Sequence, residues 1–456
     1  MCVTIGAPCV HLYASGDGAS SGAAPTPQGD DRYVFTDASA TRHVVVTRTA
    51  DGVSFAWPDD LASRDDGWDT ALVGLTVHAS GPAPHLTLTC GDITFDHYVD
   101  HAAGGLRWIN LTGLRAVLTA GVHVSVQAHN LAIASGDATL QVFDNHLDLD
   151  GRILIISPHP DDAEIAAFGL YAGRNATIVT VTCGNAGDAL YAEHIPDPVR
   201  QYRMKGVLRA IDSVTVPWQG GIRPEHAYNL GYFDARLPDM RAAPGDVIPE
   251  LYGPNTDVAP YRAANLSTLL PNGSRANAWP HLVDDVAAIL HRVNPDIVIM
   301  PFPQLDAHRD HEYATVAVYD AFAQWKGAAR FLLYTNHATG SHDEYPYGPS
   351  AAATSVPPYA RDTLAVPSVY AHPVDADLML RKFFALESMH DLRLSPFEQD
   401  AVAAGAANPS RRPDYPRQPA VDYLRRAPRP QEIFFVFDRA GVAATVEAFL
   451  RTETQR

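Results

Sequence analysis

One stretch of the chain, Ile153–Glu164, has the sequence ILIISPHPDDAE. Its first four residues are aliphatic, which is typical of a strand buried on both faces of a parallel sheet. A turn with a histidine and two adjacent aspartates follows, and a helical pattern begins directly after it. Open α/β sheets build their ligand sites at turns of this kind. The stretch therefore predicts an α/β domain with a polar site at the end of its first strand.

A second stretch, Ile297–His311, repeats this arrangement with the sequence IVIMPFPQLDAHRDH. It again places histidines and aspartates between an aliphatic run and a helical pattern. Either stretch alone is explained almost as well by a capped helix start with incidental histidines. Two such turns at one edge of the same predicted sheet are much less easily explained in that way. Together they offer the nitrogen and oxygen ligands that a metal site needs.

We predict that His159, Asp162 and His311 bind one zinc ion, with other divalent metals left open. Zinc in a hydrolase commonly takes three protein ligands and keeps a further position for water. The metal lowers the pKa of that water to about 7 and polarises a substrate carbonyl. The three ligands therefore predict hydrolytic chemistry.

Three further residues of the two stretches are assigned catalytic roles. Asp161 is the predicted general base, because it is a carboxylate beside the ligands and is not one of them. His308 is the predicted proton donor or oxyanion partner. Asp310 is expected to orient an imidazole as a hydrogen-bond acceptor.

The two stretches resemble a known family, the PIG-L/LmbE-like N-acetylglucosaminyl deacetylases. The resemblance rests on Pro158–Glu164 and on His308–His311, where Arg309 stands in place of the proline that the family usually has. Weaker sequence matches extend this resemblance over about residues 150–395. It implies a Rossmann-like fold and the zinc-dependent removal of an N-acetyl group from an amino sugar. It also implies the metal and catalytic roles given above.

The same resemblance implies two substrate-binding residues. In the family, an arginine that opens the second helix and the aspartate of a Leu-Gly-Tyr-x-Asp segment hold sugar hydroxyls. These correspond here to Arg200 and Asp234. Arg203 stands three residues after Arg200, where the family usually has glutamate.

Strand and helix patterns alternate from residue 147 to residue 456, which predicts an open, mostly parallel Rossmann-like sheet with helices on both faces. Two inserts, about 236–280 and 337–372, are expected to wall a pocket at the carboxyl ends of the strands. The predicted strands are 153–156, 177–182, 213–217, 296–300, 330–334 and 432–438, and the predicted helices are 163–173, 198–211, 282–293, 312–325 and 442–450.

The first third of the chain has a different pattern. Residues 31–146 contain short runs of alternating apolar and polar side chains separated by turn-forming residues, which predicts an all-β, sandwich-like domain. Residues 1–30 are rich in Gly, Ala, Ser and Pro and are expected to form a flexible lead-in. This pattern is compatible with a structural module and with a sugar-binding module, and both interpretations stay open.

Composition limits the kinds of partner. The chain has 456 residues and a net charge of −18, which argues against nucleic acid or an anionic membrane surface as a partner. It contains no apolar run of the roughly 20 residues that span a bilayer and no recognisable signal peptide. We therefore expect a cytoplasmic protein.

The expected partner is a small molecule or glycan that carries an N-acetylated amino sugar. One alternative is a metal-dependent amidase or deacylase that acts on a longer N-acyl group or a conjugated glycoside. Another is a carbohydrate-binding protein without activity. A phosphoesterase fits less well, because such enzymes commonly use two metal ions and more carboxylates. The sequence names neither the sugar nor the oligomeric state.

Overall fold

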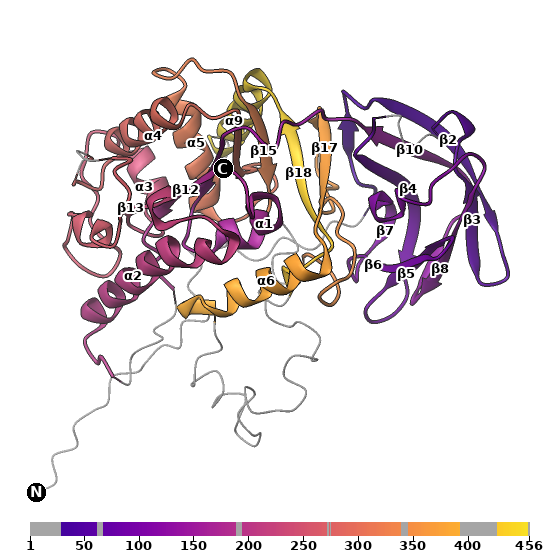
Figure 1. Ribbon diagram of the computed structural model, residues 1–456, viewed down its shortest axis with the longest axis horizontal. Coiled ribbons are helices and arrows are strands. Elements are labelled where there is room, and N and C mark those ends of the chain that lie inside the picture. Colours follow the sequence, from indigo (N-terminus) through magenta and orange to yellow (C-terminus); the bar gives the residue numbers. More distant parts are fainter. Residues whose placement is uncertain are drawn as a thin grey trace, which may run out of the picture.

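The computed structural model describes residues 29–61, 67–187, 194–270, 273, 275–338, 345–392 and 426–454. A β domain formed by the first third of the chain lies beside an α/β domain formed by the rest (Figure 1). An antiparallel β domain followed by a mostly parallel α/β domain is the predicted order. The predicted lead-in falls almost wholly on residues 1–28, which lie outside the described residues.

The β domain is an antiparallel sheet that encloses its own core. Its strands are β2 (Ala40–Arg48), β3 (Gly52–Ala56), β4 (Thr70–Ala79), β5 (His85–Cys90), β6 (Ile93–Tyr98), β7 (Gly104–Asn110), β8 (His123–His129), β9 (Leu131–Ile133) and β10 (Gly136–Phe143). They follow the order β6-β5-β8-β3-β2-β10-β4-β7, and β9 pairs with β4. β2 joins two halves, because residues 40–46 pair with β10 and residues 47–48 pair with β3.

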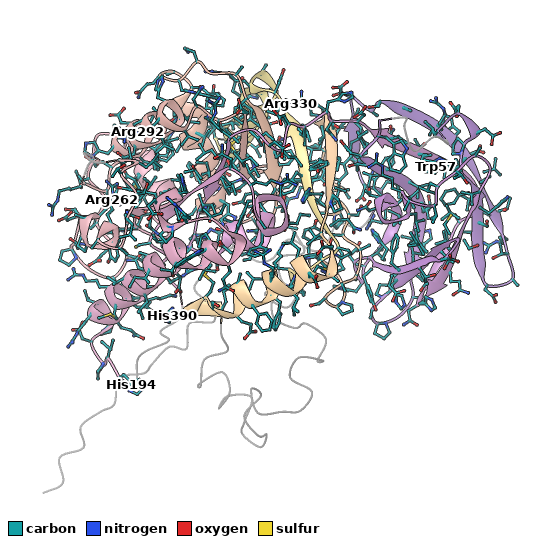
Figure 2. The ribbon with its side chains drawn as sticks, viewed as in Figure 1. Trp57, His194, Arg262, Arg292, Arg330 and His390 are labelled. Carbon is teal, nitrogen blue, oxygen red and sulfur yellow. The ribbon has the colours of Figure 1, made fainter. Side chains whose placement is uncertain are left out.

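Alternating side chains explain how these halves pack. In β5, Leu86, Leu88 and Cys90 are buried, while the residues between them are only partly buried. Apolar side chains from both halves meet in one core, among them Phe55 of β3. Trp57, labelled in Figure 2, is also buried there. This inward and outward alternation is the pattern from which the β domain was predicted.

The α/β domain is built on a seven-stranded sheet. Its strands are β11 (Ile153–Ser157), β12 (Ala176–Thr182), β13 (Ala227–Tyr232), β14 (Ile297–Pro301), β15 (Arg330–Tyr334), β17 (Ser368–Pro373) and β18 (Gln431–Phe437). They follow the order β13-β12-β11-β14-β15-β18-β17, in which β18 alone is antiparallel to its neighbours β15 and β17. The chain proceeds from β11 outward to β13 and then returns to the other side of β11 for β14. Ligands commonly bind at such a reversal of strand order.

Helices cover both faces of this sheet (Figure 1). α1 and α6 pack in one apolar core, and α4, α5 and α9 pack in the core on the opposite face, while α2 lies against β13. None of the helices in the described ranges is long and apolar enough to cross a bilayer. The helices are α1 (Asp162–Tyr171), α2 (Pro198–Thr215), α3 (Leu237–Ala242), α4 (Trp279–Val293), α5 (Arg309–Ala321), α6 (Ala376–Glu387) and α9 (Arg439–Glu453).

One predicted strand, 213–217, is wrong. Ser213–Thr215 form the last turn of α2, and Val216–Gly220 form a 3-10 helix. The β-branched residues that suggested a strand serve helix packing instead, since Val214 is buried. The next strand of the sheet is β13, which the sequence analysis treats only as part of a motif. Tertiary packing has overridden local strand propensity here.

The two predicted inserts take different courses. The first begins at the carboxyl end of β13 and contributes backbone to the candidate site described below. The second contains β16 (Leu364–Val366), which pairs in parallel with β1 (Tyr33–Phe35). Its residues 345–347, 353–356 and 358 line a cavity against the β domain. The second insert therefore contacts both domains. The expectation that it walls a pocket at the carboxyl ends of the strands stays a prediction.

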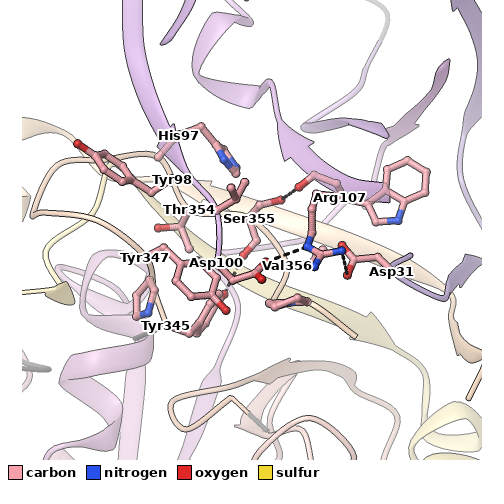
Figure 3. A pocket seen from close by; sticks show the side chains of 15 residues that line it. Asp31, His97, Tyr98, Asp100, Arg107, Tyr345, Tyr347, Thr354, Ser355 and Val356 are labelled. Atoms are coloured by element: carbon pink, nitrogen blue, oxygen red, sulfur yellow. Dashed lines mark hydrogen bonds and ion pairs between the residues drawn. The ribbon is translucent and has the colours of Figure 1, made fainter. Parts of the chain in front are cut away.

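The cavity between the domains has a volume of about 20 Å³ and a polar lining (Figure 3). His97, Asp100 and Trp108 from the β domain and Thr354 from the second insert each have a buried polar atom with no hydrogen-bond partner. A polar cavity of this size has room for one or two water molecules. The contact between the domains therefore includes a polar region at this cavity.

Three buried ionisable side chains line this cavity. Arg107 Nε donates to Asp100 Oδ2 at 2.9 Å, and Arg107 Nη1 lies 3.8 Å from Asp31 Oδ1. Burial raises the pKa of Asp31 to about 7, although Arg107 acts in the opposite direction. The folded state therefore favours the neutral form of Asp31.

This pKa predicts a pH dependence of stability. An unfolded aspartate has a pKa of about 3.9, so the native chain binds the proton of Asp31 more tightly. The contribution of Asp31 to the free energy of unfolding is expected to be highest below about pH 4. It should fall by at most about 4 kcal/mol as the pH rises through about 7. Asp31→Asn, which cannot ionise, should remove this decline in urea unfolding, whereas Asp137→Asn at an exposed site should not. An equal decline in wild type and Asp31→Asn would contradict the assignment.

Candidate metal centre

The two polar turns meet at the point where the strand order reverses. β11 and β14 are parallel neighbours, with residues 153–155 opposite residues 297–299. β11 continues through the turn that holds His159 into α1, and β14 continues through the segment that holds His308 into α5. Since both strands end at the same edge, these turns lie side by side. The predicted juxtaposition of the two motifs is present.

Three side-chain atoms form a small triangle at this edge. His159 Nδ1 lies 3.1 Å from His311 Nε2 and 3.2 Å from Asp162 Oδ2. The third side, from His311 Nε2 to Asp162 Oδ2, measures 3.0 Å. Tetrahedral zinc with bonds of 2.0–2.1 Å separates its ligand atoms by about 3.3 Å. The triangle therefore has the size that a single zinc ion needs.

The outer nitrogen of each imidazole faces a carboxylate. His311 Nδ1 lies 3.1 Å from Asp306 Oδ2. His159 Nε2 lies 3.2 Å from Asp234 Oδ1 and 3.4 Å from Asp310 Oδ2. These acceptors favour a hydrogen on the outer nitrogen, which leaves a lone pair on the inner one. The ring orientations therefore fit a metal-binding role.

The charges of the cluster favour a cation. Burial raises the pKa of Asp162, but His311 and His159 outweigh it and hold that pKa well below its usual range. Burial lowers the pKa of His311, yet the carboxylates of Asp162 and Asp306 raise it to about 10. The buried carboxylates therefore stabilise positive charge, whether protons or a metal ion carry it.

Asp162 is held firmly by its neighbours. Its Oδ1 accepts a hydrogen bond from Asn336 Nδ2 at 2.7 Å, and its Oδ2 accepts one from the His159 backbone N–H at 2.8 Å. The Asn336 backbone N–H in turn donates to Asp306 Oδ2 at 3.1 Å. Because Asp306 also meets His311, one hydrogen-bonded network fixes both the carboxylate and an imidazole of the triangle.

Asp161 lies next to the triangle in an ion pair with Arg209, whose Nη2 is 3.1 Å from Asp161 Oδ2. Both side chains are largely buried. Gly184 lies so close to Arg209 that a Cβ there would come within 2.6 Å of the guanidinium. A bulkier residue at position 184 would displace Arg209. This arrangement fixes the direction of the predicted base.

Two histidines stand beside the triangle and are less buried than it. His308 and His337 are partly exposed, whereas His159 and His311 are buried. His308 Nδ1 accepts the Asp310 backbone N–H at 3.3 Å. Burial and then the neighbouring imidazoles lower the pKa of His308 well below its usual value. A neutral His308 with hydrogen on Nε2 follows from these contacts.

All the predicted site residues except Arg200 lie in this cluster. Asp310 faces His159 and accepts backbone N–H groups of Ala235 and Leu237, and its role in orienting an imidazole stays a prediction. Asp234 also faces His159, and its sugar-binding role stays a prediction. Arg200 is exposed on the first turn of α2, beside a surface depression whose described lining includes no residue of the cluster. Its role also stays a prediction.

Sequence reasoning assigned no role to Asp306, Asn336, His337 or Arg209. A signal for Asp306 was present, because it lies five residues before His311 in the quoted stretch. Asn336 and His337 follow β15, which is the next strand end at the same edge. Inspection of every strand end would have found them. Nothing in the sequence of α2 separates Arg209 from a surface arginine.

Residues 154–322 match the PIG-L family, described as GlcNAc-PI de-N-acetylase. This range contains both polar turns and the whole triangle. Residues 154–322 form a PIG-L family domain. The matched range does not include the β domain or His337.

A comparison with curated proteins finds no match. Among solved structures, the chain is similar to the 4-carboxy-2-hydroxymuconate hydratase GalB of Pseudomonas putida KT2440. The two are 11% identical, the match covers 63% of this chain and 95% of GalB, and the TM-score is 0.28. It is also similar to a family two carbohydrate esterase of Cellvibrio japonicus, with 11% identity, 30% and 51% covered, and a TM-score of 0.13. Likenesses at these TM-scores support no conclusion about the PIG-L domain.

The contact between Asp306 and His311 predicts an effect on metal affinity. Asp306→Asn replaces a charged acceptor by a neutral one, so His311 is held less firmly and is a weaker ligand. We expect zinc affinity to fall about 10- to 100-fold, with one zinc ion still bound at saturation. Competition with a chelator measures this, and Asp284→Asn at an exposed site on α4 is the control. Unchanged affinity in Asp306→Asn would contradict the role.

Proposed function

We propose that the protein is a zinc-dependent hydrolase that removes the N-acetyl group from an N-acetylhexosamine. Water is added across the amide bond, the C–N bond breaks, and the products are acetate and a free amine on the sugar. The observation that carries the proposal is the triangle of His159 Nδ1, Asp162 Oδ2 and His311 Nε2 inside a PIG-L domain. These residues would hold the zinc ion.

Bound zinc supplies Lewis-acid chemistry, which polarises an amide carbonyl and makes a water molecule more acidic. In this proposal Asp161 accepts the proton of the attacking water, as a carboxylate that adjoins the triangle and does not belong to it. The ion pair with Arg209 supports this role, because it holds the carboxylate in one direction. Asp161 must then pass its proton on, and the leaving amine is the natural acceptor.

His308 stabilises the oxygen that becomes negative when water attacks. The backbone N–H of Asp310 occupies its Nδ1, so the neutral ring offers the N–H of Nε2. This supports the oxyanion role over that of proton donor, between which the sequence left a choice. Asp306 and Asp310 keep the two ligand imidazoles in orientation throughout.

The substrate is proposed from the family description, which names a de-N-acetylase of a GlcNAc-containing molecule. Asp234 remains the candidate for holding a sugar hydroxyl, since one of its oxygens lies beside His159 at the edge of the cluster. Arg200 would need a substrate that extends to the first turn of α2. A cytoplasmic location is part of the same proposal.

Asp161→Asn tests the base directly. The amide cannot accept the proton of water, so acetate release from N-acetylhexosamines should fall about 100- to 10,000-fold. Zinc content should stay at the wild-type level, because Asp161 is not a proposed ligand. Acetate is measured for a panel of free, nucleotide-linked and lipid-linked N-acetylhexosamines with zinc-loaded protein.

The Asp284→Asn variant is again the control and should release acetate at the wild-type rate. Full activity of Asp161→Asn would remove Asp161 as base. No acetate from any sugar with the zinc-loaded wild type would refute the proposed substrate class. Loss of zinc from Asp161→Asn would show that this carboxylate belongs to the metal site.

A further inference from the structure

His337 belongs to the candidate site although neither polar turn contains it. Its ring nitrogen lies with ligand atoms of Asp162 and His311 in a group whose members are all within 4.8 Å of one another. His308 forms a second such group with His159 and His311. Each group thus has two buried members and one partly exposed imidazole.

The two partly exposed imidazoles mark a side of the triangle that is open to solvent. Because the triangle is buried, an acyl group can reach it only from the side that is open to solvent. His308 and His337 are the partly exposed members of the two groups. Their ring centres lie 5.0 Å and 4.8 Å from that of His311, and 5.4 Å from each other. An acyl group that approaches the triangle therefore meets both rings.

The backbone of His337 is fixed by the same network as the triangle. Its N–H donates to Asp306 Oδ2 at 3.3 Å, and its carbonyl accepts the N–H of Ala307 at 2.7 Å. A β-bridge pairs Asp306 with Ala338. The carboxylate that orients His311 therefore also sets the position of His337. A ring held in this way is preorganised for contact with a bound group.

We propose that His337 is a second imidazole that contacts the acyl group of the substrate, beside His308. This inference rests on the proposed function and deepens it. During amide hydrolysis the reacting carbon becomes tetrahedral and carries two oxygen atoms, one from the carbonyl and one from water. His308 hydrogen bonds one of these oxygens and His337 hydrogen bonds the other.

Acetohydroxamate is the probe, because it has an acyl carbon with one oxygen and a neighbouring hydroxyl oxygen, and it binds divalent metals. Its Kd is measured by calorimetry with zinc-loaded wild type and His337→Ala. Loss of a hydrogen bond to a charged oxygen should weaken binding about 10- to 100-fold. His337→Gln, which keeps an N–H donor, should recover part of the loss. His291→Ala, on α4 away from the cluster, should bind as wild type does.

Zinc content and thermal unfolding are measured on the same samples. Unchanged zinc with weakened hydroxamate binding supports the proposal, and wild-type hydroxamate affinity in His337→Ala overturns it. Loss of zinc from both variants also overturns it, since His337 would then be a metal ligand. If His337→Ala does not fold, the hydroxamate Kd of His337→Gln is compared with that of wild type. Weaker binding by His337→Gln supports the proposal, and equal binding overturns it. The titration needs no turnover, so failure of every N-acetylhexosamine would refute the proposed function while leaving this contact testable.

Discussion

The parallel pairing of β11 with β14 is the constraint on which the candidate site depends. Every residue of both strands is buried, so their aliphatic side chains fix the pair between two layers of helices. His159 and His311 are 152 residues apart in the sequence and meet only because these strands end together. Slippage of one strand would separate the two imidazoles and undo the triangle. The hydrophobic packing of two short strands thus determines a polar geometry at their ends.

The cluster concentrates charge where water is scarce. Asp162, Asp306 and Asp310 are almost completely buried, and an isolated carboxylate in such a place is costly. The structure lowers this cost by placing imidazoles between the carboxylates and by directing backbone N–H groups at them. Such an arrangement gives the site a strong preference for positive charge. A divalent ion satisfies that preference with fixed geometry, which protons do not provide.

The sequence predicted the parts of the molecule that local pattern determines. Aliphatic runs before polar turns located β11 and β14, and the alternating runs located the β domain. The strand predicted at residues 213–217 was wrong because β-branched side chains also pack well at the end of a helix. The sequence analysis assigned no role to three residues, Asn336, His337 and Arg209. Their positions in the cluster depend on strand order and on neighbours that are distant in sequence. The polar contact of the second insert with the β domain is likewise a tertiary property that no local pattern contains.

The pairing of β1 with β16 has a consequence for how the chain folds as it is synthesised. The Tyr33 hydroxyl donates to the Pro357 carbonyl across 324 residues, and its ring stacks on Phe435 of β18. On the ribosome, the strands β2–β10 can pair while the rest of the chain is still missing. β1 must wait until β16 and β18 have emerged, because its partners come from the last quarter of the sequence. The first strand of the described residues is therefore among the last to be placed, and its docking joins segments from both ends of the chain.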